Sequence, residues 1–475
     1  MSGYIPHTPE ERREMLSIIG VSGEEELLAE IPAELRERAM PSLPPACTEL
    51  ELERLFGAWA GENRPTGQTA GTMLSFLGAG AYDHAIPSIV GQMIGRSEFY
   101  TAYTPYQAEM SQGLLQAIYE YQTMICELTA MDVANASVYD GASALAEAAL
   151  MAMRITKRSA VAVAPTLHPH YRRVLESYLQ GMNCAILTLP AGDGITDPAA
   201  AAAALDVSCA AVLVQQPNFF GCLEEVDVLS RAAHDAGAVL IAMVDPISLG
   251  LLAPPGDYGA DIAVGEGQPL GIPVNFGGPY LGFFATKQTF MRQLPGRIVG
   301  ATLDGAGRRG YCLTLQAREQ HIRRERATSN ICTNQALTAL AATVYMAVMG
   351  PEGLRDAATQ CWDNAHYLHR ALTQLPGVRS WSPAPFFKEF VLTLPVAGER
   401  IVRQLAEDGI VPGLAMDASG HARGGADRGG IGTGTGRELL CCVTEKRTRN
   451  ELDRLVDAMA RALQRGVSGR GHDHP

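Results

Sequence analysis

The chain has 475 residues, of which 47% are hydrophobic and 19% are charged, and its formal net charge is −13. This composition is that of a globular protein, the length predicts two or three domains, and the negative charge argues against nucleic acid or an anionic membrane as a partner. The ten cysteines form no CxxC pair and sit among apolar neighbours, as in "LLCCV", which predicts buried thiols, no metal site and a cytoplasmic location.

Residues 1–65 are expected to form an arm of short helices. Thr8, Pro9 and Glu11 mark a helix start, because the hydroxyl and the acid form a capping box and the first turn does not need the N–H that proline lacks. "SGEEELLAEIP" begins a second helix, and Pro32 marks its end.

Strands and helices alternate from about residue 110. "SQGLLQAIYEYQTMICELTAM" has helical spacing of its apolar residues, and helical segments separate the apolar strands "SAVAVAP", "CAILTLP", "CAAVLVQQP" and "AVLIAMVD". Strands that are apolar throughout predict a mostly parallel sheet covered by helices on both faces, that is, an α/β fold.

The pattern changes after Asp245. Short extended pieces, "ADIAVG" and "YLGFFATK", lie in a segment rich in Gly and Pro, and a long helix is expected from about residue 314 through "REQHIRRERATS". A smaller α+β unit follows, with helices near 335–348, 354–375 and 447–464 and strands "EFVLTL" and "ELLCCVTE". The Gly/Arg-rich segment 417–437 lacks the GKS or GKT ending of a phosphate-binding loop and is expected to be a flexible surface loop.

These observations predict four parts of the chain. They are a helical arm at 1–65, a large α/β domain at 66–334, a small α+β domain at 335–465 and a disordered tail at 466–475.

Polar residues at the predicted strand ends suggest a binding site. Asn218 and Asp245 each follow an apolar strand, and ligands of open parallel sheets bind at the carboxyl ends of strands. In "YDGASALAEAAL", Gly141 and Ser143 leave backbone N–H groups accessible at the positive end of a helix, where an anion can bind.

This combination is typical of a pyridinium cofactor. Asp245 would keep the ring nitrogen protonated, Asn218 would contact the phenolic oxygen, and His168 or His170 would stack on the ring. Aspartate and asparagine at strand ends also serve as helix caps, so each residue taken alone leaves both interpretations open.

A pyridoxal enzyme also needs a lysine on the turn after the next strand. That turn is "GEGQPLG", and it carries Gln268, whose carboxamide nitrogen is not nucleophilic. Of the four lysines, Lys157 precedes a strand and Lys388 and Lys446 lie in the predicted small domain. Lys287 is therefore the remaining candidate, although a solvated lysine at a strand end is the simpler interpretation.

A dense polar and aromatic loop, "SEFYTAYTPYQAEMSQG", precedes the first helix of the sheet domain. Pro105 stiffens it, and its hydroxyls and amides suggest a pocket or an interface, whereas packing on the core is the alternative. A second segment, "MLSFLGAGAYDH", ends in His84.

Five motifs together resemble the P-protein family of glycine cleavage, in its two-chain bacterial form: "YTAYTPYQAEMSQG", "NASVYDGASALAEAAL", "VQQPNFFG", "FGGPYLGFFATK" and "REQHIRRERATSNICTNQAL". The resemblance covers most of residues 1–412 and returns at "LLCCVTE". It implies fold type I of the pyridoxal-phosphate enzymes and an α2β2 complex with a homologous beta subunit. That complex decarboxylates glycine and passes the aminomethyl group to the lipoyl arm of H-protein.

The resemblance also implies which of the two subunits binds the cofactor. The beta subunit carries the cofactor-binding lysine, so this chain binds no pyridoxal phosphate covalently, in agreement with Gln268. Residues expected to reach the partner's site are Tyr103, Tyr106, Gln107 and His84. Residues expected to form a degenerate cofactor site are Ser143, His168, Asn218 and Asp245. Two alternatives stay open: a self-sufficient pyridoxal decarboxylase or lyase that uses Lys287, and a purely structural scaffold.

Overall fold

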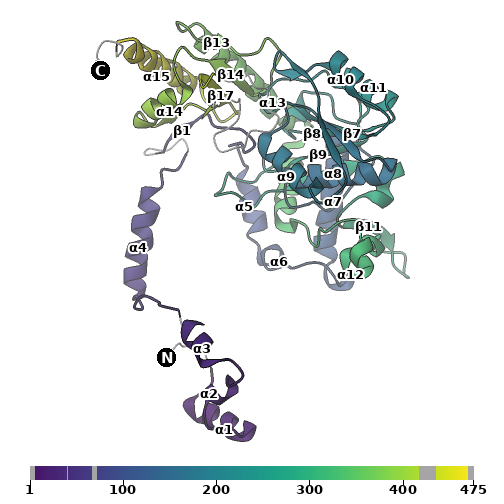
Figure 1. Ribbon diagram of the computed structural model, residues 1–475, viewed down its shortest axis with the longest axis vertical. Coiled ribbons are helices and arrows are strands. Elements are labelled where there is room, and N and C mark those ends of the chain that lie inside the picture. The colour runs from purple at the N-terminus through teal and green to yellow at the C-terminus, as the bar shows by residue number, and fades with distance from the viewer. Residues whose placement is uncertain (1–5, 40, 67–71, 417–434, 469–475) are drawn as a thin grey trace. The chain divides into compact units, whose positions relative to one another are not determined.

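The computed structural model describes residues 6–39, 41–66, 72–416 and 435–468, and the chain divides into two units, 1–64 and 65–475 (Figure 1). The first unit is helical, as predicted, and the capping box of Thr8 and Glu11 is present, as is a second one at Thr48 and Glu51. No residue of its helices is buried. The helices are α1 (Pro9–Ile19), α2 (Glu24–Leu27), α3 (Ala33–Ala39) and α4 (Glu49–Glu62).

A seven-stranded sheet of order β2-β10-β9-β8-β7-β3-β4 forms the centre of the second unit. The five strands from β9 to β4 run parallel, and β10 is antiparallel to both of its neighbours. The predicted mostly parallel sheet is thereby confirmed. The strands are β2 (Val133–Ala134), β3 (Ala160–Val163), β4 (Ala185–Thr188), β7 (Cys209–Gln216), β8 (Val239–Val244), β9 (Ile262–Glu266) and β10 (Gly282–Thr286).

Helices cover both faces of this sheet (Figure 1). Successive side chains of a strand point to opposite faces, so Val212 of β7 packs in one core cluster and Leu213 in the other. Both clusters are apolar, which explains why the strands lack a polar alternation. The helices of this region are α5 (Ser88–Ile94), α6 (Ser97–Tyr100), α7 (Gln112–Thr129), α8 (Gly141–Thr156), α9 (Pro169–Leu179), α10 (Pro198–Ala204) and α11 (Val226–Asp235).

A four-stranded antiparallel sheet of order β13-β14-β17-β16 holds the C-terminal part of the chain. Its apolar face packs against the second half of α13 and against α14 and α15. A separate short pair, β1 and β15, joins residue 74 to residue 410 in parallel. The elements are β1 (Leu74–Ser75), β13 (Arg379–Ser380), β14 (Glu389–Thr393), β15 (Ile410–Val411), β16 (Leu414–Ala415), β17 (Glu438–Cys442), α13 (Ala336–Thr373), α14 (Gly398–Glu407) and α15 (Arg449–Ser468).

Helix α13 connects the two sheets. The two helices expected on either side of residue 350 are confirmed: α13 consists of two helical stretches that meet at a kink at Gly350, whose φ of 59° lies in the left-handed region that glycine tolerates. Among the described residues, α13 is the one helix whose length and composition would allow it to cross a membrane. Several of its apolar side chains, Ala358 and Leu368 among them, are buried in the core, whereas Val348 is 52% exposed.

Two details differ from the expectations. The long helix predicted from residue 314 is wrong: short turns flank a single helical turn, because the Arg318 side chain donates to the carbonyls of Leu315 and Gly296 and Arg324 has a φ of 51°. Helix α15 continues to Ser468, three residues into the predicted tail. Residues 417–434 and 469–475 lie outside the described part. The remaining elements are β5 (Ala191–Gly192), β6 (Ile195–Thr196), β11 (Ile298–Leu303), β12 (Arg309–Thr314) and α12 (Gln320–Arg323).

Candidate functional site

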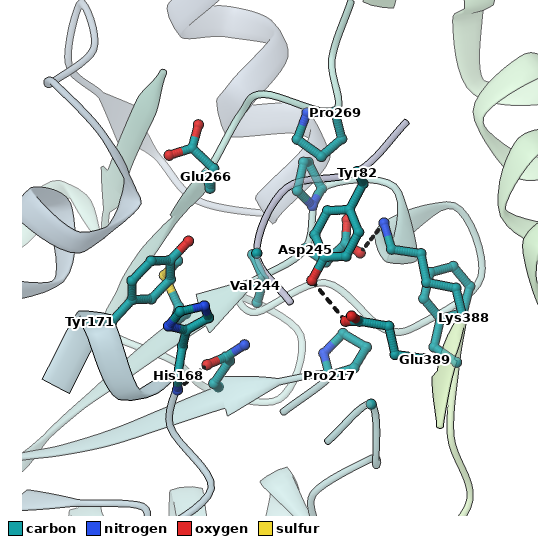
Figure 2. Close-up of a pocket in the computed structure, with 16 residues that line it drawn as sticks. Tyr82, His168, Tyr171, Pro217, Val244, Asp245, Glu266, Pro269, Lys388 and Glu389 are labelled. Atoms are coloured by element: carbon teal, nitrogen blue, oxygen red, sulfur yellow. Dashed lines mark hydrogen bonds and ion pairs between the residues drawn. The ribbon is translucent and has the colours of Figure 1, made fainter. Parts of the chain in front are cut away.

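A small cavity lies where β7, β8 and β9 end, and residues just before β14 close it (Figure 2). Its volume is about 30 Å³, which is room for roughly two water molecules. The lining residues labelled in Figure 2 are Tyr82, His168, Tyr171, Pro217, Val244, Asp245, Glu266, Pro269, Lys388 and Glu389.

Lys388 fills the space beside Asp245. Its side chain is 2% exposed, and Nζ lies 2.6 Å from Asp245 Oδ2 and 3.7 Å from the centre of the Tyr82 ring. Burial by itself lowers the pKa of Lys388, but the surrounding groups, Asp245 first among them, together outweigh it, and the pKa lies above its ordinary value. The lysine is therefore charged, and its ammonium occupies the position beside Asp245 that a pyridinium nitrogen would need.

The neighbouring Glu389 is bound on both carboxylate oxygens. Tyr82 donates its hydroxyl to Oε2 at 2.8 Å, and the Ala79 N–H donates to Oε1 at 2.7 Å. Burial raises the pKa of Glu389 to about 7. The glutamate thus ties the segment around residue 80 to the start of β14.

His84 continues the chain of polar contacts behind Lys388. The lysine donates to His84 Nε2 at 2.9 Å, so Nδ1 carries the proton and donates to Glu445 Oε2 at 2.7 Å. Burial raises the pKa of Glu445, but the hydrogen bonds from His84 and from the Ala85 N–H outweigh it and lower the pKa to about 2. Cys361 brings its thiol within 3.3 Å of the same oxygen. The adjacent ammonium disfavours a metal ion among these donors.

The N-terminus of α8 is already occupied by carboxylates of this chain. Asp140 caps the helix and accepts the Ser143 N–H at 2.7 Å. Glu266 Oε2 accepts the Gly141 N–H at 2.9 Å, and its other oxygen accepts two further backbone N–H groups. A phosphate would meet two acidic side chains at the place where the sequence predicted an anion cradle.

Replacing Glu266 by glutamine should flatten the pH dependence of stability. Burial raises the pKa of Glu266 from 4.5 to about 7, so between these values the folded chain binds more protons than the unfolded one. The group's contribution to the free energy of unfolding is therefore fully present below about pH 4.5 and is lost as the pH rises through 7.

Urea unfolding at pH 5, 6, 7 and 8 measures this slope. We expect Glu266→Gln to remove on the order of 1–3 kcal/mol of the decline between pH 5 and pH 8. Glu109→Gln, at an exposed position, is the control. An unchanged slope in Glu266→Gln would show that Glu266 does not titrate in this range.

Gln268 stands on the turn where a cofactor-binding lysine would be expected, and it has a structural role there. It lies just after β9, is 1% exposed, and all of its hydrogen-bonding groups point into the chain. Oε1 accepts the Tyr82 N–H at 2.9 Å, and Nε2 donates to the carbonyls of Tyr82 and Ile272 at 3.0 and 2.6 Å. The carboxamide therefore holds the segment that carries Tyr82 over the cavity.

Of the other residues predicted to bind a cofactor, one lines the cavity and the others make structural contacts elsewhere. His168 lines the cavity, stacks on Tyr171 and contacts the Ala79 carbonyl at 2.9 Å, and burial lowers its pKa to about 4. Asn218 does not line the cavity, and it fixes its own loop by accepting the N–H groups of Phe220 and Cys222. Lys287 lies outside the cavity as well, at 2.6 Å from Asp261.

The charged groups around this cavity do not suit pyridoxal phosphate. Lys388 neutralises Asp245, and the carboxylates of Asp140 and Glu266 take the N–H groups at the helix start. The groups that would hold the ring nitrogen and the phosphate are thus satisfied within the chain.

A second candidate site is the tyrosine loop, residues 100–107. Tyr103 and Tyr106 are 82% and 63% exposed, and Gln107 is exposed beside them. Arg297 is buried under this loop, and its Cζ atom lies 5.4 Å from the centre of the Tyr106 ring. His84 is buried behind Lys388 and does not belong to this surface.

The sequence did not reveal Lys388, Glu389, Glu266 or Arg297 as site residues. Lys388 was assigned to the small domain by its position, because a contact between the two sheets leaves no local pattern. One signal was present: in "FFKEFVLTL" two charged residues interrupt an otherwise apolar run, which marks them as buried and paired.

The strand order, the aspartate after β8 and the helix start beside it define fold type I of the pyridoxal-phosphate-dependent enzymes. The family model for the glycine cleavage system P-protein matches residues 2–417. The chain belongs to this family.

Relatives and solved structures agree with this assignment. The chain is 52% identical over 453 residues to the probable glycine dehydrogenase (decarboxylating) subunit 1 of Desulforamulus reducens, covering 95% of this chain and 98% of that protein. It is 51% identical over 456 residues to the protein of the same name in Moorella thermoacetica, covering 96% and 98%. The crystal structure of glycine decarboxylase (P-protein) of the glycine cleavage system, in inhibitor-bound form, matches with a TM-score of 0.85 at 46% identity, covering 97% and 100%. A sphingosine-1-phosphate lyase of Burkholderia pseudomallei, 13% identical with a TM-score of 0.61, covers 90% and 93% and shares the fold alone.

Proposed function

We propose that this chain is the alpha subunit of a two-chain, cytoplasmic glycine decarboxylase and that it is inactive by itself. The name "subunit 1" of its relatives implies a partner subunit. The proposed complex is α2β2. It decarboxylates glycine, releases carbon dioxide and passes the aminomethyl group to the lipoyl arm of H-protein. Pyridoxal phosphate, held by a lysine of the beta subunit, supplies the electron sink for the loss of carbon dioxide.

The observation that carries this proposal is the filled cavity. A family member whose Asp245 and helix N–H groups are already paired within the chain, and which has Gln268 where the lysine is expected, needs a partner that binds the cofactor. The exposed tyrosine loop is the surface by which this chain would complete the partner's site. Tyr103, Tyr106 and Gln107 would bind and orient the substrate there and exclude water.

A self-sufficient enzyme that uses Lys287 is not favoured, because the Lys287 ammonium is held by Asp261 outside the cavity. Lys388 is the one lysine that lines the cavity, and its ion pair with Asp245 keeps the amine protonated and therefore not nucleophilic. The alternative of a purely structural scaffold differs from the proposal in one respect: in it, the tyrosine loop would contribute no residue to the partner's active site.

Borohydride reduction tests the proposal. The purified chain, mixed with pyridoxal phosphate and lipoylated H-protein, should release no carbon dioxide from glycine, and a separate sample reduced with borohydride should carry no cofactor adduct. The complex with subunit 2 should release carbon dioxide in the first assay and carry the adduct in the second, with one cofactor per αβ pair. An adduct on the isolated chain that is lost in Lys287→Ala or Lys388→Ala would contradict the proposal and would identify the lysine used.

A further inference from the structure

Arg297 is a buried cation under the tyrosine loop. It is 5% exposed and precedes β11, where its backbone carbonyl accepts the Ala136 N–H at 2.8 Å. Its guanidinium makes one short contact, from Nη2 to the Cys332 carbonyl at 2.8 Å. The other contacts go to neutral oxygens at 3.3–3.5 Å, and Nε has no hydrogen-bond partner in the described part of the chain. The guanidinium is therefore incompletely satisfied.

No carboxylate of the described chain pairs with it. Among the lysines and arginines of that part, three are buried: Arg297, Lys388 and Arg447. Lys388 contacts Asp245 and Arg447 contacts Asp83, so these two have acidic partners. An uncompensated buried cation costs several kcal/mol, which is why buried charges are normally paired. Arg297 thus lacks the anion that its burial calls for.

The surroundings indicate the side from which an anion would come. The cavity on one side of Arg297, which Arg318 and Glu319 also line, measures about 10 Å³, room for about one water molecule. Thr104 and Tyr106 of the exposed tyrosine loop also contact the guanidinium, at 3.3 and 3.4 Å, and they do not line that cavity. A partner seated on this loop would therefore bring its anion to Arg297 from the loop side.

We infer that Arg297 is an anion-binding residue that this chain contributes to the partner's active site, where it binds a carboxylate or phosphate oxygen. The two sources of that group are the carboxylate of glycine and the phosphate of the cofactor held by subunit 2. Guanidinium binds both kinds of group through paired N–H donors. The Thr104, Thr333 and Tyr106 hydroxyls, at 3.3–3.4 Å from the guanidinium, hold it in place. This inference rests on the proposed function.

The test uses the reconstituted complex with Arg297→Gln and Arg297→Lys. Arg308→Gln is the control, because Arg308 is 81% exposed in the turn between β11 and β12. Charged hydrogen bonds are worth about 1.5–3 kcal/mol, so Arg297→Gln should weaken binding of the anion about 10- to 100-fold, and Arg297→Lys should recover part of the loss. Assembly is followed by size-exclusion chromatography.

Two binding measurements distinguish the sources. If the anion is the phosphate, the Kd for pyridoxal phosphate, followed by absorbance, rises in Arg297→Gln, while that for pyridoxal, which lacks the phosphate, does not. If the anion is the carboxylate, the KM for glycine rises, while inhibition by methylamine, which lacks the carboxylate, is unchanged.

Either of two results would overturn the inference. If the Kd for pyridoxal phosphate and the KM for glycine both stay within twofold in an assembled Arg297→Gln complex, Arg297 binds no anion and only stabilises the fold of its own chain. If both variants lose assembly, its counterion is an acidic side chain of the partner's surface. Failure of the proposed function looks different: subunit 2 would then decarboxylate glycine without this chain, whatever residue stands at position 297.

Discussion

Lys388→Met is expected to lower the free energy of unfolding of this chain by about 3–5 kcal/mol. The substitution leaves the Asp245 carboxylate, whose side chain is 12% exposed, without the ammonium now 2.6 Å away. It also removes the donor to His84 Nε2. The large value follows from stranding a charge in a cavity that holds about two waters. Urea unfolding of the full chain measures it.

Two further variants separate this effect from a general loss of packing. Adding Asp245→Asn to Lys388→Met removes the stranded charge and should restore most of the stability. Lys287→Met is the matched control: its ion pair with Asp261 is also 2.6 Å long, but the lysine side chain is 39% exposed, so the expected cost is at most about 1 kcal/mol. Equal losses in Lys388→Met and Lys287→Met would refute the role given to burial.

Tyr103→Phe and Tyr106→Phe should each lower kcat/KM for glycine in the reconstituted complex by about 10- to 100-fold. Each change removes one hydroxyl from an exposed side chain, and a hydrogen bond to a charged group is worth about 1.5–3 kcal/mol. Glycine-dependent exchange of labelled bicarbonate measures the rate. Cofactor content and the αβ stoichiometry should remain those of the unaltered complex.

Tyr100→Phe is the control for this pair. Tyr100 belongs to the same loop and is 68% exposed, but it is not among the residues proposed to reach the partner. A normal rate in both Tyr103→Phe and Tyr106→Phe, with the complex assembled, would favour the scaffold alternative. A loss of similar size in all three would indicate that the loop as a whole, rather than two particular hydroxyls, supports the site.

The fold was predictable because its signals are local. Apolar strands, intervening helices and capping boxes such as Thr8–Glu11 are written in short stretches of sequence, and the structure contains them. The helix expected from residue 314 failed for a tertiary reason. Arg318 bonds to backbone carbonyls, one of them 22 residues earlier in the chain, and no local propensity reveals such a contact.

The site was predictable only in part. Asp245, His168 and the start of α8 could be located because each lies at a strand or helix end of the large sheet. The filling of the cavity could not, since it depends on Lys388 meeting Asp245 across 142 intervening residues. The sequence showed that Gln268, and not a lysine, stands on this turn, but it did not show that the carboxamide bonds to the backbone of Tyr82 and Ile272.

The Lys388–Asp245 pair also limits how this chain moves. Lys388 precedes β14 of the small sheet and Asp245 follows β8 of the large one, so the pair joins the two sheets. An opening that separated them would break this contact and expose both charges to water. Amide hydrogens at the facing ends of β8 and β14 should therefore exchange together. The ion pair thereby couples any movement of the small sheet to the large one.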